Sequence, residues 1–278
     1  MRGDRARVGS GVAAALGVLE VLTESEEALP LSELARRLGV SKATVARVVA
    51  ELVESGYVAR LPSGRAYRAD YGLLALAGDL LKRLVLRQRA APHLLRLAAR
   101  TRLICYLGVL WRRETIVLDR AAPHLVHEQA MDIGKRSPMH GSSMAKAILA
   151  YLPEEVRRRT LEDYEFRPLT PRSITSAPAF LEELEHTRSR GYATSDGELS
   201  DWARSVAAPV LGPDGLPVGA LAAADWDPGQ MPAVRLTSVV EETREAALAV
   251  SHAIGFAAPP FPSRSLRSLD SRGGPAAD

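Results

Sequence analysis

The sequence predicts an α+β protein of two domains joined by a helix. Its 278 residues exceed the length of a typical single domain, about 150 residues. Residues 1–70 read as three short helices and a hairpin, whereas residues 91–258 alternate loosely between strands and helices around one sheet. A leucine-rich helix over 71–90 links the two parts. The tail 259–278 is rich in Pro, Ser, Gly and Arg and is expected to be disordered.

Three helices are expected before the hairpin. Over 12–23, apolar residues recur at helical spacing and predict a face that can be buried, formed by Val12, Ala15, Leu16, Leu19 and Leu22. The second helix covers 31–38 and ends at Gly39, because glycine readily adopts a positive φ. Ser41 is a natural N-cap for a third helix that runs to about residue 55.

The remaining elements follow from strand and helix patterns. The β-prone stretches "YVARL" and "RAYRAD" flank the turn signal "PSG" and predict a hairpin. The linker helix is expected from Tyr71 to about Arg89, with Pro92 at its break and a further helix over 94–99. Later strands are "LICYLGVLW", "ETIVLD", "RSVAAPVLG" and "PVGALAAADW"; later helices are "SMAKAILAYL", "PAFLEELEHTRSRG" and "AVRLTSVVEETREAALAVSHAIG".

Composition narrows the class of protein. The formal net charge of +3 does not by itself indicate nucleic acid, and the basic run over 82–102 fits either an anionic neighbour or a solvated helix face. Cys105 is the single cysteine, so no intrachain disulfide can form and a cytoplasmic location fits. No stretch approaches the roughly 20 apolar residues of a membrane span. The histidines are scattered and form no metal-ligand spacing, so we expect neither metal nor cofactor.

The second and third helices have the features of a helix-turn-helix. Ala35 is small where the helices cross, Gly39 permits the turn, and Val45 and Val48 can pack the third helix onto the second. The N-terminal end of that third helix enters the major groove in this motif. We therefore expect Ser41, Lys42, Ala43, Thr44 and Arg47 to face DNA, with Arg47 able to bind a guanine bidentately. The hairpin would form the wing, where Arg60 and Arg65 can contact the DNA backbone.

A second candidate site is the segment "HGSSMAKA". Ser142 and Ser143 stand where a helix begins, and unpaired backbone N–H groups at such a position attract anions such as a small carboxylate. Ser142 can also serve simply as the cap of that helix. His140 by itself is expected to be a structural histidine.

Taken together, these segments resemble the IclR family of bacterial transcription regulators. The resemblance rests on the helix-turn-helix and on "SPMHGSSMAKAILAYLPEE", "RPLTPRSITS", "LEELEHTRSRGYATSDGE" and "SVAAPVLGPDGLPVGAL". It implies a C-terminal effector-binding domain similar to GAF and PAS folds, a helical linker, and homodimers that often pair into tetramers.

The resemblance also implies a set of effector-binding residues. Relatives that bind small keto- or hydroxy-acids use backbone N–H groups at positions matching Ser143 and Met144, and side chains at positions matching Ser195, Ser205, Ala222 and Ala224. This chain departs from the pattern, because Ala222 and Ala224 replace serines, the acidic residue is the neighbouring Asp196, and Trp202 stands where a small residue is usual. We expect a larger or more apolar effector, such as an aromatic acid.

The sequence thus predicts a regulator, a repressor, whose binding to a palindromic double-stranded operator responds to a small organic acid. Two alternatives remain open at this stage. The winged helix could serve protein–protein interaction, or Ser142 could act as the nucleophile of a hydrolase. The segment "GSSMA" lacks the second half of the nucleophile elbow G-x-S-x-G, so an enzyme is not expected.

Overall fold

The computed structural model describes residues 11–62, 64–123, 130–226 and 233–257. The chain divides into two compact units, Met1–Leu84 and Val85–Asp278. The disorder expected over 259–278 concerns residues outside the described ranges.

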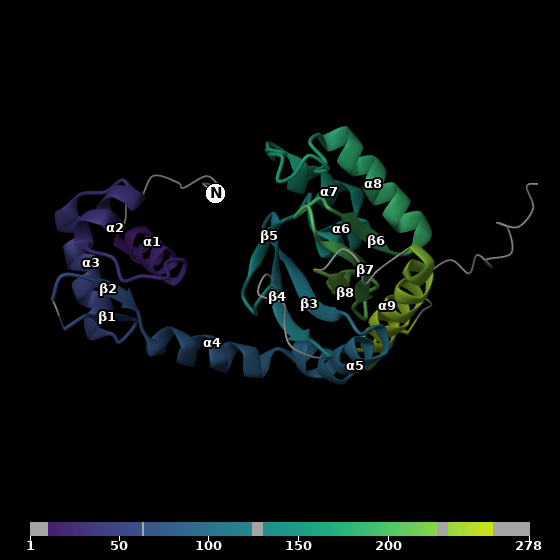
Figure 1. Ribbon diagram of the computed structural model, residues 1–278, viewed down its shortest axis with the longest axis horizontal. Helices are drawn as coiled ribbons and strands as arrows, with labels where there is room; N and C mark the ends of the chain where they lie inside the picture. Colours follow the sequence, from purple (N-terminus) through teal and green to yellow (C-terminus); the bar gives the residue numbers. More distant parts are fainter. Residues whose placement is uncertain (1–10, 63, 124–129, 227–232, 258–278) are drawn as a thin grey trace, which may run out of the picture. The chain divides into compact units, whose positions relative to one another are not determined.

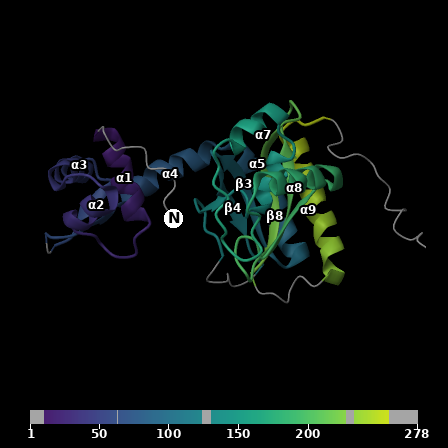
Figure 2. The same ribbon diagram turned by 90° about the horizontal axis from the view of Figure 1, so that it is seen from above.

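The first unit consists of three helices, a two-stranded hairpin and a fourth helix. These elements are α1 (Gly11–Thr23), α2 (Leu31–Leu38), α3 (Lys42–Glu54), β1 (Val58–Arg60), β2 (Tyr67–Ala69) and α4 (Tyr71–Arg83). Figures 1 and 2 show α1, α2 and α3 grouped around one centre, which Ala14, Val18, Leu34, Val45 and Val48 fill. The strands pair antiparallel, and Leu29 bridges to Tyr67 beside them. This is a winged helix-turn-helix.

The predicted end of the second helix at Gly39 and the predicted start of the third helix at Ser41 are confirmed. Gly39 follows α2 with φ of 68°, the left-handed conformation in which a side chain is strained. Ser41 caps α3, because its Oγ accepts a hydrogen bond of 3.1 Å from the backbone N–H of Thr44. The turn between the two helices is therefore built from residues whose conformations are set locally.

The buried face of the first helix agrees with the prediction only in part. Leu22 is buried, and Ala15 and Leu19 pack half-buried against the core. Val12 and Leu16, however, are 71% and 58% exposed, and the other buried residues are Ala14, Val18 and Val21. The segment is apolar around most of its circumference, so helical spacing alone could not select the face that packs against α2 and α3.

The helix break after the hairpin also lies elsewhere than expected. α4 ends at Arg83, Leu84 is extended with ψ of 96°, and α5 (Val85–Thr101) then continues through Pro92. Residues 85–90, expected in the linker, belong to α5, and Ala90 is fully buried in the second unit. Leu84 is not a helix-breaking residue type. The break falls where the chain changes from α4, which buries none of its residues, to a helix that packs on a sheet.

The second unit is built on one antiparallel sheet with the strand order β5-β4-β3-β8-β7-β6. Its strands are β3 (Ile104–Trp111), β4 (Glu114–Ala121), β5 (Arg136–Pro138), β6 (Ala193–Asp196), β7 (Arg204–Leu211) and β8 (Pro217–Asp225); its remaining helices are α6 (Ser143–Leu149), α7 (Glu154–Leu161), α8 (Ala177–Arg190) and α9 (Ala233–Ala253). The short elements β5, α7 and β6 have no clear apolar periodicity and were not predicted.

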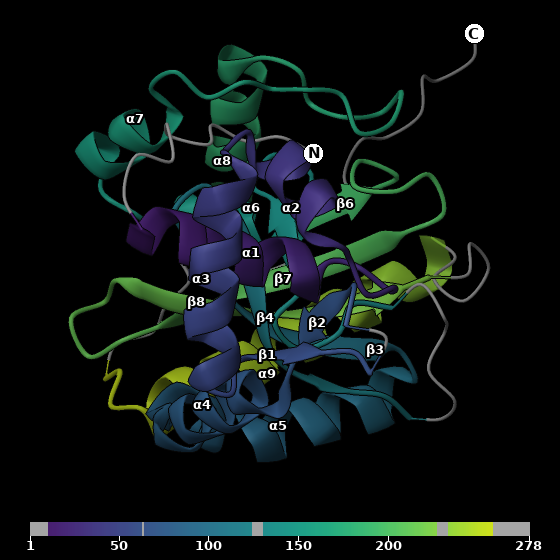
Figure 3. The same ribbon diagram turned by 90° about the vertical axis from the view of Figure 1, so that its left-hand side faces the viewer.

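Helices cover both faces of this sheet. Figure 3 shows α5 and α9 on one side of the strands, with α6 and α8 on the other. Successive side chains of β3 point to opposite faces of the sheet. Cys105 and Leu107 therefore pack in the core with α5 and α9, while Tyr106 packs with Met144 and Ala147 of α6. Burial raises the pKa of the Cys105 thiol to about 12. The sheet face under α6 holds the candidate site.

Replacing Gly39 by alanine tests the turn. An added Cβ would meet nothing within 4 Å, so Gly39→Ala should lower the free energy of unfolding by about 1 kcal/mol through backbone strain alone. Gly78→Ala, also in open space but in the interior of α4, should raise it by about 0.5–1 kcal/mol. Urea unfolding followed by circular dichroism measures both, and equal effects of the two variants would contradict the strained-turn interpretation.

Candidate functional site

The outward surface of α3 is formed by the residues that the sequence singled out. Lys42, Ala43 and Arg47 are exposed, whereas Thr44 is half-buried. The hydroxyls of Ser41 and Thr44 hydrogen-bond each other at 2.8 Å, and Ser41 also caps the helix. These two hydroxyls therefore fix the start of α3, and Lys42 and Arg47 are the cations that it presents.

Arg47 is held beside an acidic neighbour. Its Nη1 lies 2.8 Å from Oε1 of Glu51, one turn later on α3, and both side chains are more than 60% exposed. An exposed pair of this kind contributes little to stability, roughly 0.3–0.5 kcal/mol. The guanidinium can therefore exchange Glu51 for a nucleic acid acceptor at small energetic cost.

The hairpin arginines have different roles. Arg60 donates from Nε and Nη2 to the carbonyl of Gly64 at 3.0 and 2.8 Å, and its guanidinium lies over the Tyr67 ring. Arg60, predicted to contact DNA, therefore also holds the turn of the hairpin. Arg65 is exposed on the hairpin.

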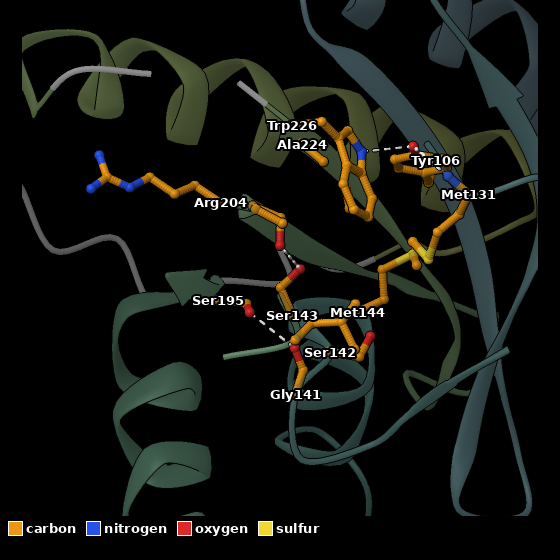
Figure 4. A pocket seen from close by; sticks show the side chains of 14 residues that line it. Tyr106, Met131, Gly141, Ser142, Ser143, Met144, Ser195, Arg204, Ala224 and Trp226 are labelled. Carbon is orange, nitrogen blue, oxygen red and sulfur yellow. Dashed lines mark hydrogen bonds between the residues drawn. The ribbon is translucent and has the colours of Figure 1, made fainter. Parts of the chain in front are cut away.

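In the second unit, a pocket lies between the start of α6 and the sheet (Figure 4). It encloses about 380 Å³ of empty space, part of it open to solvent. Seven of the eight residues proposed from sequence for effector binding line it: Ser142, Ser143, Met144, Ser195, Ser205, Ala222 and Ala224. Cross-strand pairing explains the convergence, because Ser205 lies opposite both Ser195 and Ala224 in the sheet.

The four serines of the pocket are already ordered by hydrogen bonds. Ser143 and Ser205 share a hydrogen bond of 2.7 Å between their Oγ atoms, and Ser195 donates to the carbonyl of Gly141 at 2.9 Å. Ser142 caps α6 through the N–H of Ala145 and lies 3.1 Å from Thr115 Oγ1. The backbone N–H groups of Ser143 and Met144, at the first two positions of α6, have no acceptor within the helix.

Two residues expected near the effector lie elsewhere. Asp196 does not line the pocket; it is exposed and pairs with Arg204 at 2.8 Å and with Arg172 at 3.4 Å. It follows Ser195 on β6, and successive residues of a strand point to opposite faces. Trp202 is 45% exposed and is absent from the lining.

The aromatic lining comes instead from residues that the sequence did not suggest. Tyr106, Met131 and Trp226 line the pocket across from Gly141, Ser142 and Ser143 (Figure 4). A signal for Tyr106 was present: it follows Cys105 in a strand with alternating faces and pairs with Ala222 in the neighbouring strand. Met131 and Trp226 come from outside the strands, so their convergence depends on the fold.

A buried ion pair connects α6 to the segment that contributes Leu199 to the pocket. The Lys146 side chain is completely buried, and its Nζ lies 2.8 and 2.9 Å from the two carboxylate oxygens of Glu198 and 3.6 Å from Glu183. Glu198 precedes Leu199, which lines the pocket. Burial raises the pKa of Glu198 above its ordinary value, although the neighbouring ammonium opposes this shift. The pair joins α6 to the segment between β6 and β7.

His140 is structural, as expected. Its Nε2 lies 2.9 Å from the carbonyl of Arg167, which can only accept, so Nε2 donates and Nδ1 accepts from the hydroxyl of Tyr164 at 2.7 Å. Burial lowers the pKa of His140, which favours this neutral form. The residue thereby fixes the segment that leads into α6.

Within the described residues, no three His, Cys, Asp or Glu side chains are grouped closely enough to hold a metal ion. No helix in the described part of the chain is long and apolar enough to cross a membrane.

A winged helix-turn-helix in one unit and a pocket beside the sheet of the other are the arrangement of a DNA-binding transcriptional regulator with a C-terminal effector domain. The chain belongs to the IclR family. Residues 11–62 match the family model "IclR helix-turn-helix domain", and residues 78–252 match "Bacterial transcriptional regulator IclR C-terminal".

Characterised relatives are similar along nearly their whole length. The HTH-type transcriptional regulator XynR of Escherichia coli (strain K12) is 28% identical over 244 residues, covering 88% of this chain and 96% of the relative. The glycerol operon regulatory protein of Streptomyces griseus is 31% identical over 245 residues, covering 87% and 94%. Both are regulators of transcription and not enzymes.

Solved structures share the fold. An IclR homologue from Microbacterium hydrocarbonoxydans, complexed with 4-hydroxybenzoate, is 30% identical with a TM-score of 0.74, covering 88% of this chain and 99% of that one. An IclR regulator from Alicyclobacillus acidocaldarius is 28% identical with a TM-score of 0.76, covering 88% and 98%.

Replacing Lys146 by methionine tests the buried ion pair. The change leaves the Glu198 carboxylate without its closest cation, so Lys146→Met should lower the free energy of unfolding by about 3 kcal/mol. Adding Glu198→Gln should recover part of the loss. Lys82→Met removes an exposed lysine that pairs with Asp79 and should change stability by less than about 0.5 kcal/mol. Denaturant unfolding measures all three, and a Lys146→Met variant as stable as Lys82→Met would refute this role.

Proposed function

We propose that the protein is a repressor whose binding to a palindromic operator is modulated by a small organic acid, of the aromatic class, in the pocket of the second unit. The observation that carries the proposal is the composition of that pocket. Polar groups from α6 and β7 lie at one side and aromatic and methionine side chains at the other (Figure 4). A molecule with a carboxylate and an apolar ring matches both sides.

Three features favour an aromatic acid over a very small one. Ala222 and Ala224 offer no hydroxyl to a small keto- or hydroxy-acid, which would leave its oxygens with fewer partners. Trp226 supplies an aromatic surface in the lining, whereas Trp202 does not line the pocket. The complex of the Microbacterium relative with 4-hydroxybenzoate supports the same class of ligand. The carboxylate would meet the backbone N–H groups of Ser143 and Met144.

DNA binding is assigned to residues 1–70. Lys42 and Arg47 present positive charge at the N-terminal half of α3, and Arg65 does so on the wing. Ser41, Ala43, Thr44 and Arg60 complete the proposed contact surface, with the Ser41 and Arg60 side chains also holding the local backbone. Phosphate contacts would position the protein, and Arg47 would read a base.

A homodimer, or a dimer of dimers, is part of the proposal. Tyr71, Leu74, Leu76 and Leu80 of α4 are between 61% and 76% exposed, and a second copy would cover such an apolar surface. Two-fold dimers read half-sites about 34 Å apart. The segment 71–90 would transmit the effector's influence from residues 91–258 to the spacing of the two α3 helices. A cytoplasmic location is part of the same proposal.

The two alternatives have less support. A nucleophilic Ser142 needs an adjacent base, but its Oγ contacts Thr115 and the N–H of Ala145, and within the described residues no histidine hydrogen-bonds to it. A winged helix that binds only protein would not require exposed cations at the start of α3. Removing those cations distinguishes a DNA-binding winged helix from one that binds only protein, because only the first would lose affinity for DNA.

Arg47→Ala should weaken binding to a DNA fragment from upstream of the protein's own gene by about 10-fold or more. Because it removes one cationic contact, the slope of log affinity against log salt should fall by up to about one. Arg159→Ala removes an exposed arginine with the same 2.8 Å pair to a glutamate one turn away, on α7, and should leave DNA binding unchanged. Fluorescence anisotropy across salt concentrations measures this; equal binding by wild type and Arg47→Ala would contradict the proposed surface.

Addition of 4-hydroxybenzoate should change the affinity of the wild-type protein for the same fragment by about 5-fold or more, the usual range of coupling between two sites. Glyoxylate at the same concentration should have little effect, because Ala222 and Ala224 provide no hydroxyls for it. Binding of each acid is measured by calorimetry. Tight glyoxylate binding without aromatic acid binding would refute the proposed effector class, and loss of the gene without increased transcription of its targets would refute repression.

A further inference from the structure

Tyr106 lies at the aromatic side of the pocket with its side chain fully buried. It comes from the middle of β3 and points to the sheet face that α6 covers, beside Ala222 of β8. Figure 4 shows its hydroxyl near Trp226 and Met131, across the pocket from Gly141, Ser142 and Ser143. This hydroxyl is therefore a polar group inside an otherwise apolar part of the lining.

The hydrogen bonds of Tyr106 determine where its proton can go. The phenol oxygen lies 2.9 Å from Nε1 of Trp226 and 3.2 Å from the backbone N of Met131. An indole N–H and a backbone N–H can only donate, so the Tyr106 oxygen accepts both bonds. Its own proton cannot be used in either contact. Among the described residues, no acceptor receives that proton.

Ala222, Ala224 and Met144, which line the pocket with Tyr106, present apolar side chains. Burial raises the pKa of Tyr106 to about 12, so the phenol keeps its proton at neutral pH. A buried donor needs an acceptor, and an oxygen of a molecule bound in the pocket can accept this proton.

We propose that Tyr106 is a specificity-determining residue that donates its hydroxyl proton to an oxygen on the effector, opposite the effector's carboxylate. The inference rests on the proposed function, in which the pocket binds a small aromatic acid. It adds that the ring carries a hydroxyl or other oxygen acceptor on the side remote from α6. Trp226 and Met131 act as positioning residues, because their two N–H groups fix the phenol oxygen and leave only its proton for the ligand.

This arrangement discriminates between ligands of nearly the same size. An aromatic acid that carries hydrogen or methyl at that place fills the same volume but leaves the buried donor of Tyr106 without a partner. A site built around a hydrogen bond rejects an analogue that lacks the bonding atom much more strongly than a purely apolar site does.

Calorimetric titration with 4-hydroxybenzoate, benzoate and 4-methylbenzoate tests the inference. Wild type should bind 4-hydroxybenzoate at least about 10-fold more tightly than the other two acids. Tyr106→Phe should lose most of that selectivity while its affinity for benzoate stays the same. Tyr192→Phe is the matched control, since Tyr192 is another tyrosine of the second unit, packs against the α5/α9 core on the opposite face of the sheet and does not line the pocket. It should retain wild-type selectivity.

The outcomes separate this inference from the proposed function. If wild type binds all three acids with equal affinity, or if Tyr106→Phe keeps the wild-type selectivity, the role of Tyr106 is refuted and an aromatic effector stands. If none of the three acids binds wild type, the aromatic effector fails and the inference fails with it. The comparison of acids on wild type requires no variant, so it decides the question even if Tyr106→Phe does not fold.

Discussion

The charge of Lys146 is the constraint on which the effector domain depends. An ammonium group without solvent exposure must be neutralised by carboxylates at close range, and Glu183 of α8 and Glu198, both later in the chain, supply them. Lys146 lies on α6, one turn after the residues that begin the pocket, and Glu198 is adjacent to Leu199 of the pocket wall. This ion pair therefore holds both α6 and the segment between β6 and β7 in place. A pocket wall of irregular backbone thereby gains a defined position.

Small side chains allow this helix to approach the sheet closely. A Cβ added at Gly108 of β3 would lie 2.6 Å from the sulfur of Met144, and Ala220, Ala222 and Ala224 follow one another on the same face of β8. The small size of these residues keeps α6 in contact with the strands. The polarity of the pocket is then set by a few groups: serines on one side and a tyrosine on the other.

Sequence reasoning succeeded where a structural feature is decided by neighbouring residues. Gly39 and Ser41 set the turn and the start of α3 through their own conformational preferences, and the apolar positions Val45 and Val48 fixed which face of α3 is buried. The prediction for Asp196 was wrong because β6 was not recognised as a strand. Successive side chains of a strand point to opposite faces, so Asp196 points away from the pocket that Ser195 lines. The helix break predicted near Pro92 lies at Leu84 instead, and helical periodicity carried no signal for it because Leu84 is not a helix-breaking residue type. Tyr106, Met131 and Trp226 meet across more than a hundred residues of sequence, a distance over which local patterns carry no information.

The solitary sulfhydryl of Cys105 has a practical consequence for studying motion in this molecule. It is fully buried in the core between β3 and the α5/α9 layer, and only the thiolate form of cysteine reacts readily. In the folded state it is therefore inert toward maleimides and methanethiosulfonates. A cysteine engineered on the surface of α3 or α4 can then be labelled selectively with a spin or dye probe without removing the native one.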